Sequence, residues 1–277
     1  MQELPKQTWG EAGDRPPLYF AHANAYPPGS YSPIISALAE QQQVISYLQR
    51  PLWQPAPDPS SLHNWQQLAD DVVRFFDQNQ MKNVVAVGHS LGSVTAFMAA
   101  RKRPDLIKAL VMIEPVALPG LFCWMTRLLP SLVKSRVNII DKALNRPHQF
   151  DSLQSAFDFH RKTRAFKRLS DDNLWHYIRA AFRSCEQGFC LAYPREWEAR
   201  VYGTATAYRH HLLRSQLPVL ALRGGHTTTI DEKFWRRWRQ NPNHQLVDFP
   251  DAGHLLPLED PQGVLAEVLP FVEQHQR

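Results

Sequence analysis

The sequence is poor in the residues and runs that mark several classes of protein. Its 277 residues include 3 cysteines, at positions 123, 185 and 190, an odd count without metal-ligand spacing. We therefore expect buried thiols in a reducing compartment, with no disulfide framework and no metal site. No segment is long and apolar enough to span a membrane, and the first residues lack the apolar run of a signal peptide. These absences predict a cytoplasmic protein without stable membrane insertion.

Charge is also unevenly distributed along the chain. The net charge is +5, of which residues 116–213 carry +7 and the remainder −2, counting Lys and Arg against Asp and Glu. An excess of positive charge can attract anionic partners. Here the charges are scattered among aromatic residues and fit no nucleic-acid-binding motif, so they predict a solvated surface and no nucleic-acid partner. The sequence carries no signal for an oligomeric state.

Strand and helix patterns alternate through the first 115 residues. Two segments predict helices, an amphipathic one at 61–79 and another at 92–103. Short apolar runs predict buried strands at 17–24, 42–49, 83–87 and 108–115. This alternation is typical of an α/β fold in which helices flank a mainly parallel sheet.

The alternation stops after Pro115 and resumes near residue 217. Residues 116–213 lack clear strands and are rich in aromatic, basic and leucine residues at helical spacing. Strand and helix patterns then return to the end of the chain. We predict a core of residues 1–115 and 214–277, with residues 116–213 forming a helical cap inserted after the strand that ends at Glu114. An insertion on the loop side of such a sheet covers the site at the strand ends.

The segment "VGHSLGS" places a serine at the tightest bend of the chain. A buried strand precedes Gly88 and a helix follows Gly92, and a Cβ at either glycine would collide with the neighbouring strand or helix. Ser90 then projects from the strand end beside the following N–H group, which is the G-x-S-x-G pattern of a nucleophilic serine. The alternative is a serine N-cap between two turn glycines.

A serine nucleophile needs an imidazole to take its proton. His254 lies in "FPDAGHLLPLEDP", a loop just after the last predicted strand, and it follows the serine in the order expected of a triad. His89, directly before the serine, is expected to point off the opposite side of the turn and to pack there.

Three motifs in this order resemble the α/β-hydrolase superfamily. "GHSLG" is similar to its nucleophile turn, "DAGHLLPLEDP" to its histidine loop, and "YFAHANAYPPGSY" to its oxyanion loop. A cap between two core halves resembles the branch that contains esterases, lipases, C–C hydrolases, epoxide hydrolases and haloalkane dehalogenases. The resemblance implies an eight-stranded sheet, and the short N-terminal part suggests a strand or so fewer here.

The resemblance also implies an oxyanion hole. Where the family carries His-Gly-X, this sequence has His22-Ala23-Asn24, so Asn24 matches the donor of one N–H group and Leu91 that of the other. Ala23 can replace glycine only if its backbone needs no positive φ. Asn24 could instead serve only as a turn residue.

The acid of the triad departs from the family pattern. The usual position, a few residues beyond "PVLALRG", falls at or near Thr228, which cannot supply a charge. Glu114 ends the strand next to the nucleophile strand, and some haloalkane dehalogenases resemble this arrangement. We favour Glu114 as the acid. Asp231 is the alternative acid, although it also fits the first turn of the next helix.

Serine in place of the aspartate of epoxide hydrolases and dehalogenases indicates acyl transfer through an acyl-enzyme. The sequence therefore predicts hydrolysis of a small-molecule carboxylic ester, without cofactor or metal. Aromatic residues of the insertion, if they line the site, favour an apolar acyl group, and otherwise they pack the cap. The alternatives are a C–C bond hydrolase acting on a diketone, a membrane-surface lipase suggested by the apolar stretch 118–133, and a non-catalytic ligand receptor on a hydrolase scaffold.

Overall fold

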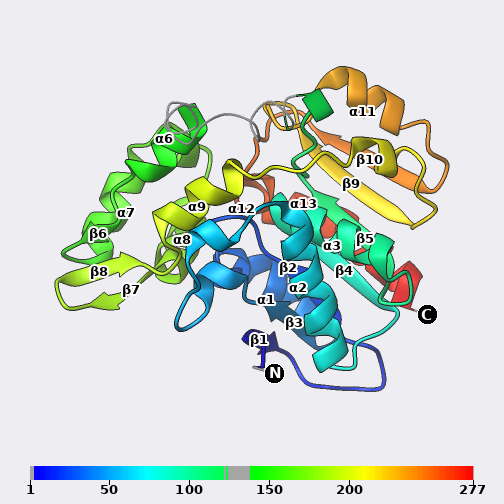
Figure 1. Ribbon diagram of the computed structural model, residues 1–277, viewed down its shortest axis with the longest axis horizontal. Coiled ribbons are helices and arrows are strands. Elements are labelled where there is room, and N and C mark those ends of the chain that lie inside the picture. Colours follow the sequence, from blue (N-terminus) through cyan, green and yellow to red (C-terminus); the bar gives the residue numbers. More distant parts are fainter. Residues whose placement is uncertain (1–2, 122, 124–137, 277) are drawn as a thin grey trace.

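The computed structural model describes residues 3–121, 123 and 138–276 and has a seven-stranded sheet at its centre (Figure 1). The strand order is β1-β3-β2-β4-β5-β9-β10, and every neighbouring pair is parallel except β1 with β3. The strands are β1 (Lys6–Trp9), β2 (Leu18–Ala21), β3 (Val44–Tyr47), β4 (Val84–His89), β5 (Ile107–Ile113), β9 (Val219–Gly224) and β10 (His244–Phe249). The α/β fold is confirmed, with seven strands in this sheet.

Helices cover both faces of the sheet because the central strands are apolar on both sides. In β4, Val84 and Ala86 belong to one hydrophobic cluster, whereas Val85 and Val87 belong to the other. The first cluster also draws on α2 (Trp65–Gln78), α3 (Leu91–Lys102) and α11 (Glu232–Trp238), and the second on α1 (Ser32–Ala39), α12 (Leu256–Glu259) and α13 (Pro261–Gln276). This two-sided burial explains why the strands read as continuous apolar runs.

Residues 116–213, which we call the cap segment, contain helices and a small second sheet. The helices are α6 (Asn138–Leu144), α7 (Leu153–Arg161), α8 (Asp171–Ala181), α9 (Arg195–Tyr202) and α10 (Arg209–Leu212). The sheet is antiparallel, with order β6-β8-β7, from β6 (Gln149–Phe150), β7 (Phe182–Cys185) and β8 (Gly188–Leu191). Most of these elements lie to one side of the core (Figure 1). The insertion contains the predicted helices and, in addition, strands of two to four residues, which are too short to show alternation in the sequence.

The cysteines also differ from expectation. Cys185 and Cys190 form a disulfide across the β7–β8 hairpin, and Cys123, which is buried, is not part of it. The hairpin brings the two cysteines together because Arg183 pairs with Cys190 in the antiparallel register, two residues from Cys185. Cysteine content therefore no longer supports a reducing compartment, and the cytoplasmic location stays a prediction.

Two further expectations concern apolar side chains of the cap segment. The stretch 118–133 lies largely outside the described residues, as do Phe122 and Trp124. Phe157 stacks on Trp175 with ring centroids 4.5 Å apart, so these aromatic residues pack the cap segment itself. No helix in the described part of the chain combines the length and the apolar character that crossing a membrane requires.

Candidate active site

Ser90 sits at a strained bend between β4 and α3. Its backbone has φ 52° and ψ −122°, a left-handed conformation that L-residues rarely adopt. A Cβ built at Gly88 would lie 2.7 Å from Cα of Ser93, and one at Gly92 would overlap the carbonyl oxygen of Ala21. The flanking glycines are thus required by close backbone approach, as the sequence pattern predicts.

The structure brings Ser90, His254 and Glu114 into one chain of hydrogen bonds. Oγ of Ser90 lies 3.0 Å from Nε2 of His254, and Nδ1 of the same ring lies 3.0 Å from Oε2 of Glu114. The carboxylate only accepts, so Nδ1 carries the proton and Nε2 is free to accept from the serine hydroxyl. This is the tautomer that a general base beside a serine nucleophile requires.

Glu114 is completely buried and is held by the loop after β9. Its N–H donates to Leu222 O at 2.8 Å, and Gly224 N–H donates to Oε1 at 2.5 Å. The hydroxyl of Thr227 donates to Oε2 at 2.5 Å and that of Thr229 to the same oxygen at 3.3 Å. The backbone of Glu114, with φ 48°, is as unusual as that of Ser90. This set of donors satisfies the buried carboxylate and orients it toward the imidazole.

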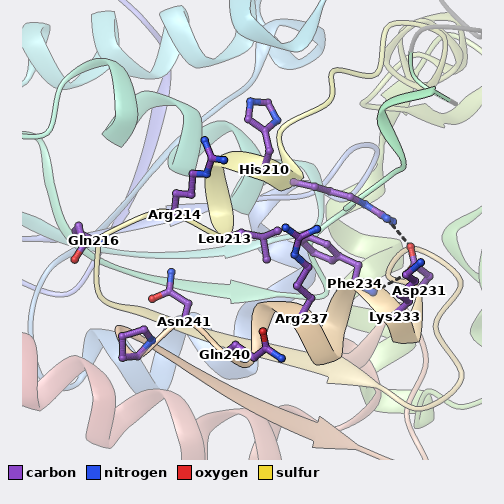
Figure 2. A pocket seen from close by; sticks show the side chains of 12 residues that line it. His210, Leu213, Arg214, Gln216, Asp231, Lys233, Phe234, Arg237, Gln240 and Asn241 are labelled. Carbon is purple, nitrogen blue, oxygen red and sulfur yellow. Dashed lines mark hydrogen bonds and ion pairs between the residues drawn. The ribbon is translucent and has the colours of Figure 1, made fainter.

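Asp231, the alternative acid, is engaged elsewhere. It caps α11 by accepting from Phe234 N–H at 2.8 Å, and it pairs with Arg209 at 2.5 Å. Figure 2 shows Asp231 at the edge of a hollow between α10 and α11 that is lined largely by exposed polar and basic side chains. The structure therefore does not bring Asp231 to His254, and its role as a helix cap matches its place in the sequence.

The loop after β2 directs the N–H of Asn24 through its neighbour. Nε2 of His22 accepts from Gln49 N–H at 3.2 Å, so Nδ1 carries the proton and donates to the Ala23 carbonyl at 2.9 Å. That carbonyl and the N–H of Asn24 belong to one planar trans peptide group, so fixing one fixes the direction of the other. Ala23 is absent from the described non-glycine residues with positive φ, which meets the condition for alanine at this position.

The side chain of Asn24 is held on both of its polar atoms. Tyr193 donates to Oδ1 at 2.7 Å, and Nδ2 donates to the carbonyl of Glu198 at 3.2 Å. Within the described residues, the N–H groups of Asn24 and Leu91 donate to no protein atom. Asn24 thus ties the loop to α9 with its side chain while its N–H stays available, so the turn and oxyanion interpretations are compatible.

A cavity of about 310 Å³ opens above Ser90. The residues that line it are Ala23, Asn24, Tyr26, Trp65, His89, Ser90, Leu91, Val116, Leu118, Ile139, Ile140, Val201, Tyr202, Ala205, Thr228, Thr229 and His254. Most are apolar, and the aromatic residues Phe157, Phe159, Trp175 and Phe182 of the cap segment are not among them. Of the two alternatives left open for the aromatic residues, packing of the cap segment therefore holds for these four.

Apart from His89 and His254, the described lining of the cavity contains no acidic or basic side chain. Arg146, which is not part of this lining, pairs with Glu198 at 2.6 Å and donates to the Tyr177 hydroxyl at 2.7 Å. The positive charge of this partly buried guanidinium is therefore compensated by a carboxylate. Burial raises the pKa of the Tyr26 and Tyr202 phenols, which are therefore neutral. In the described part of the chain, no group of three His, Cys, Asp or Glu side chains could hold a metal ion. The site favours a neutral, mainly apolar ligand.

His89 does more than the packing that the sequence suggested. Its ring is completely buried and makes hydrogen bonds to Tyr31 and to the main chain of His254. Tyr31 lies 58 residues away and His254 165 residues away, so nothing near His89 in the sequence could have indicated either contact.

Comparison with known proteins places this chain in a family. A sequence model described as alpha/beta hydrolase fold matches residues 16–261. The chain belongs to the α/β-hydrolase fold family. The chain is 21% identical over 264 residues to an uncharacterized hydrolase, YugF, of Bacillus subtilis, covering 88% of this chain and 85% of that protein. It is 33% identical over 101 residues to ethanol acetyltransferase 1 of Cyberlindnera jadinii, a match over 36% of this chain and 29% of that protein.

Solved structures resemble the whole chain. The crystal structure of E-2-(acetamidomethylene)succinate hydrolase superposes with a TM-score of 0.79 at 19% identity, over 98% of this chain and 95% of that one. A thermophilic esterase from Thermogutta terrifontis superposes with a TM-score of 0.71 at 20% identity, over 99% and 94%. At this level of identity the likeness shows the fold alone. The family supports hydrolase activity.

Proposed function

We propose that the chain is a serine hydrolase that cleaves a neutral carboxylic ester with an apolar acyl group. The observation that carries the proposal is the hydrogen-bonded sequence from Ser90 through His254 to Glu114, with both separations at 3.0 Å. Two N–H groups without a protein acceptor, at Asn24 and Leu91, support an oxyanion hole beside the nucleophile.

In the first half of the reaction, Oγ of Ser90 attacks the ester carbonyl carbon while Nε2 of His254 takes the hydroxyl proton. The carbonyl oxygen becomes an oxyanion that accepts from the N–H groups of Asn24 and Leu91. Glu114 stabilises the imidazolium that forms and keeps the ring oriented. The tetrahedral intermediate then collapses, His254 gives its proton to the leaving alkoxide, and an alcohol departs from the acyl-enzyme.

In the second half, water takes the place of the alcohol. His254 removes one proton from the water as its oxygen attacks the acyl carbon. Collapse of the second tetrahedral intermediate breaks the bond to Oγ of Ser90, which recovers its proton from His254. The products are a carboxylic acid and the regenerated enzyme.

The lining of the cavity supports a neutral substrate. Val116, Leu118 and Ile140 offer apolar contact, and Arg146 is already paired with Glu198, so its guanidinium is not available to attract a carboxylate. We therefore infer an uncharged acyl chain, bound by burial of its methylene groups, each contributing about 0.8 kcal/mol.

A panel of p-nitrophenyl esters of increasing acyl length tests the proposal. We expect the wild-type chain to hydrolyse them and Ser90→Ala to lose about a million-fold in kcat, the scale of a triad that acts as a unit. Ser60→Ala, which changes an exposed serine, is the matched control and should keep wild-type rates. Wild-type protein that hydrolyses no ester of the panel would contradict the proposal. It would favour the alternative of a non-catalytic ligand receptor on a hydrolase scaffold.

Transfer of the acyl group to an alcohol is the second candidate. Its support is the likeness of part of the chain to ethanol acetyltransferase 1, together with an apolar cavity in which an alcohol can compete with water. The acyl-enzyme would be the same, and only the attacking nucleophile would differ. Ethyl ester formed from a p-nitrophenyl ester in dilute ethanol, in excess over the free acid, would favour the transferase; free acid alone would favour the hydrolase.

A further inference from the structure

His89 and Tyr31 link the two loops that flank the nucleophile. The N–H of Ala23, in the loop after β2, lies 3.2 Å from the Tyr31 hydroxyl. That hydroxyl lies 2.8 Å from Nδ1 of His89, and Nε2 of His89 lies 2.8 Å from the carbonyl oxygen of His254. Four residues from three separate segments of the sequence thus form one continuous chain of hydrogen bonds.

The direction of each hydrogen bond in this chain follows from its ends. The His254 carbonyl can only accept, so Nε2 of His89 carries a proton. Burial, together with the nearby His254 ring, lowers the pKa of His89 well below 6.5, so the ring is neutral and Nδ1 accepts. Tyr31 must then donate its proton to Nδ1, and its oxygen accepts the N–H of Ala23. Every polar atom in the chain is satisfied by this one arrangement.

The ends of the chain lie next to the groups that the proposed mechanism uses. Ala23 immediately precedes Asn24, whose N–H is proposed to bind the oxyanion, and His254 carries the proposed base. Both Tyr31 and His89 are completely buried, with ring centroids 5.7 Å apart, so neither can change its contacts without disturbing the packing. The His89 ring also packs against the His254 ring at 5.2 Å.

We propose that His89 and Tyr31 are positioning residues that hold the oxyanion loop and the histidine loop at a fixed separation across Ser90. This inference rests on the proposed function, because it assigns the two residues a part in acyl transfer. Neither residue donates or takes a proton in the reaction. Their effect is that the N–H of Asn24 stays directed at the developing oxyanion while Nε2 of His254 stays directed at Oγ of Ser90.

Such a link acts on the transition state more than on the bound ester. The oxyanion and the imidazolium exist only as the reaction proceeds, so loose placement of their partners lowers kcat and changes KM little. A misplacement near 1 Å can cost about 100-fold. A trifluoromethyl ketone, which adds to the serine and forms a similar oxyanion, should lose affinity in parallel with kcat.

Single and double variants test the link directly. Tyr31→Phe and His89→Leu should each lower kcat by about 10- to 100-fold, with rates normalised to the active sites that a fluorophosphonate titrates. Because both break one chain, the double variant should lose no more than the worse single variant. His89→Gln should recover part of the loss of His89→Leu, since an amide offers a donor and an acceptor with the spacing of the two ring nitrogens.

Tyr47→Phe is the matched control, because Tyr47 is a buried tyrosine whose hydroxyl has no partner among the described residues. It should keep wild-type kcat. Two results would overturn this inference and leave the proposed function standing. One is a double variant whose loss in kcat is the product of the two single losses. The other is that Tyr31→Phe and His89→Leu match the control in kcat and in inhibitor affinity. Wild-type protein that reacts with neither ester nor fluorophosphonate would overturn the proposed function, and this inference with it. If His89→Leu does not fold, Tyr31→Phe and His89→Gln still decide the matter.

Discussion

The hydroxyl of Thr227 lies 2.5 Å from Oε2 of Glu114, the oxygen that also contacts His254. Thr227 belongs to the loop after β9, where the family resemblance places the acid. In this chain the loop supplies hydroxyl and N–H donors, and the carboxylate comes from the end of β5. The carboxylate that contacts the imidazole thus comes from the end of β5, and the end of β9 and the loop after it hold that carboxylate in place.

Glu114→Gln should lower kcat/KM by up to roughly ten-thousand-fold, the scale known for triad acids. The amide keeps the shape but cannot stabilise the imidazolium, and it can donate to Nδ1, which favours the wrong tautomer. Asp231→Asn is the matched control and should stay within a few-fold of wild type, because Asp231 caps α11. A larger loss in Asp231→Asn than in Glu114→Gln, measured on one p-nitrophenyl ester, would reverse the assignment.

Leu118→Ala should shift the preferred ester toward longer acyl chains. Leu118 lines the cavity, and shortening its side chain makes room for two or so further methylene groups, each contributing about 0.8 kcal/mol when buried. The ratio of kcat/KM for octanoate over butyrate should therefore rise by about 10-fold or more. Leu213→Ala, which removes a leucine from the hollow between α10 and α11, should leave the ratio unchanged. An unchanged ratio in Leu118→Ala would show that the acyl group binds elsewhere.

Acid should destabilise the fold through His22. Burial, opposed in part by main-chain hydrogen bonds, lowers the pKa of this imidazole from 6.5 to about 4. As the pH falls below 6.5, His22 becomes protonated in the unfolded chain, whereas in the folded chain it stays neutral down to about pH 4. The free energy of unfolding therefore declines across this window, by about 3 kcal/mol for the full displacement.

Urea unfolding at pH 7 and pH 4.5 measures this decline. His22→Asn, which keeps a donor for the Ala23 carbonyl but does not titrate, should lose less stability between the two pH values than wild type. His63→Asn changes an exposed histidine and should keep the wild-type difference. Equal losses in wild type and His22→Asn would show that His22 is not the group responsible.

The parts of the fold that local pattern specifies could be predicted from the sequence. The buried strands, the bend at Ser90 and the need for Gly88 and Gly92 all follow from residues within one short segment. Glu114 could also be identified from the sequence as the candidate acid. It ends an apolar run beside the nucleophile strand, and Thr228 stands at the usual position of the acid, so few other carboxylates remain as candidates. In each case the physical cause lies close to the residue in the sequence.

Features that depend on distant contacts were missed. The bonds of His89 to Tyr31 and His254 join segments far apart, and no periodicity marks them. The disulfide of Cys185 and Cys190 follows from the register of a hairpin whose strands are too short to be recognised by alternation. Whether the aromatic residues line the cavity could not be decided from the sequence for the same reason, since aromatic content says nothing about which side of a small sheet or helix faces the site.

The most direct measurement of the central claim is mass spectrometry of the chain after reaction with a fluorophosphonate. The account predicts one adduct, on the peptide that carries Ser90, formed at a rate that His254→Ala lowers by several orders of magnitude, because the base that activates the hydroxyl is gone. Ser90→Ala should remain unlabelled. An adduct on another residue, or labelling of His254→Ala at the wild-type rate, would contradict it.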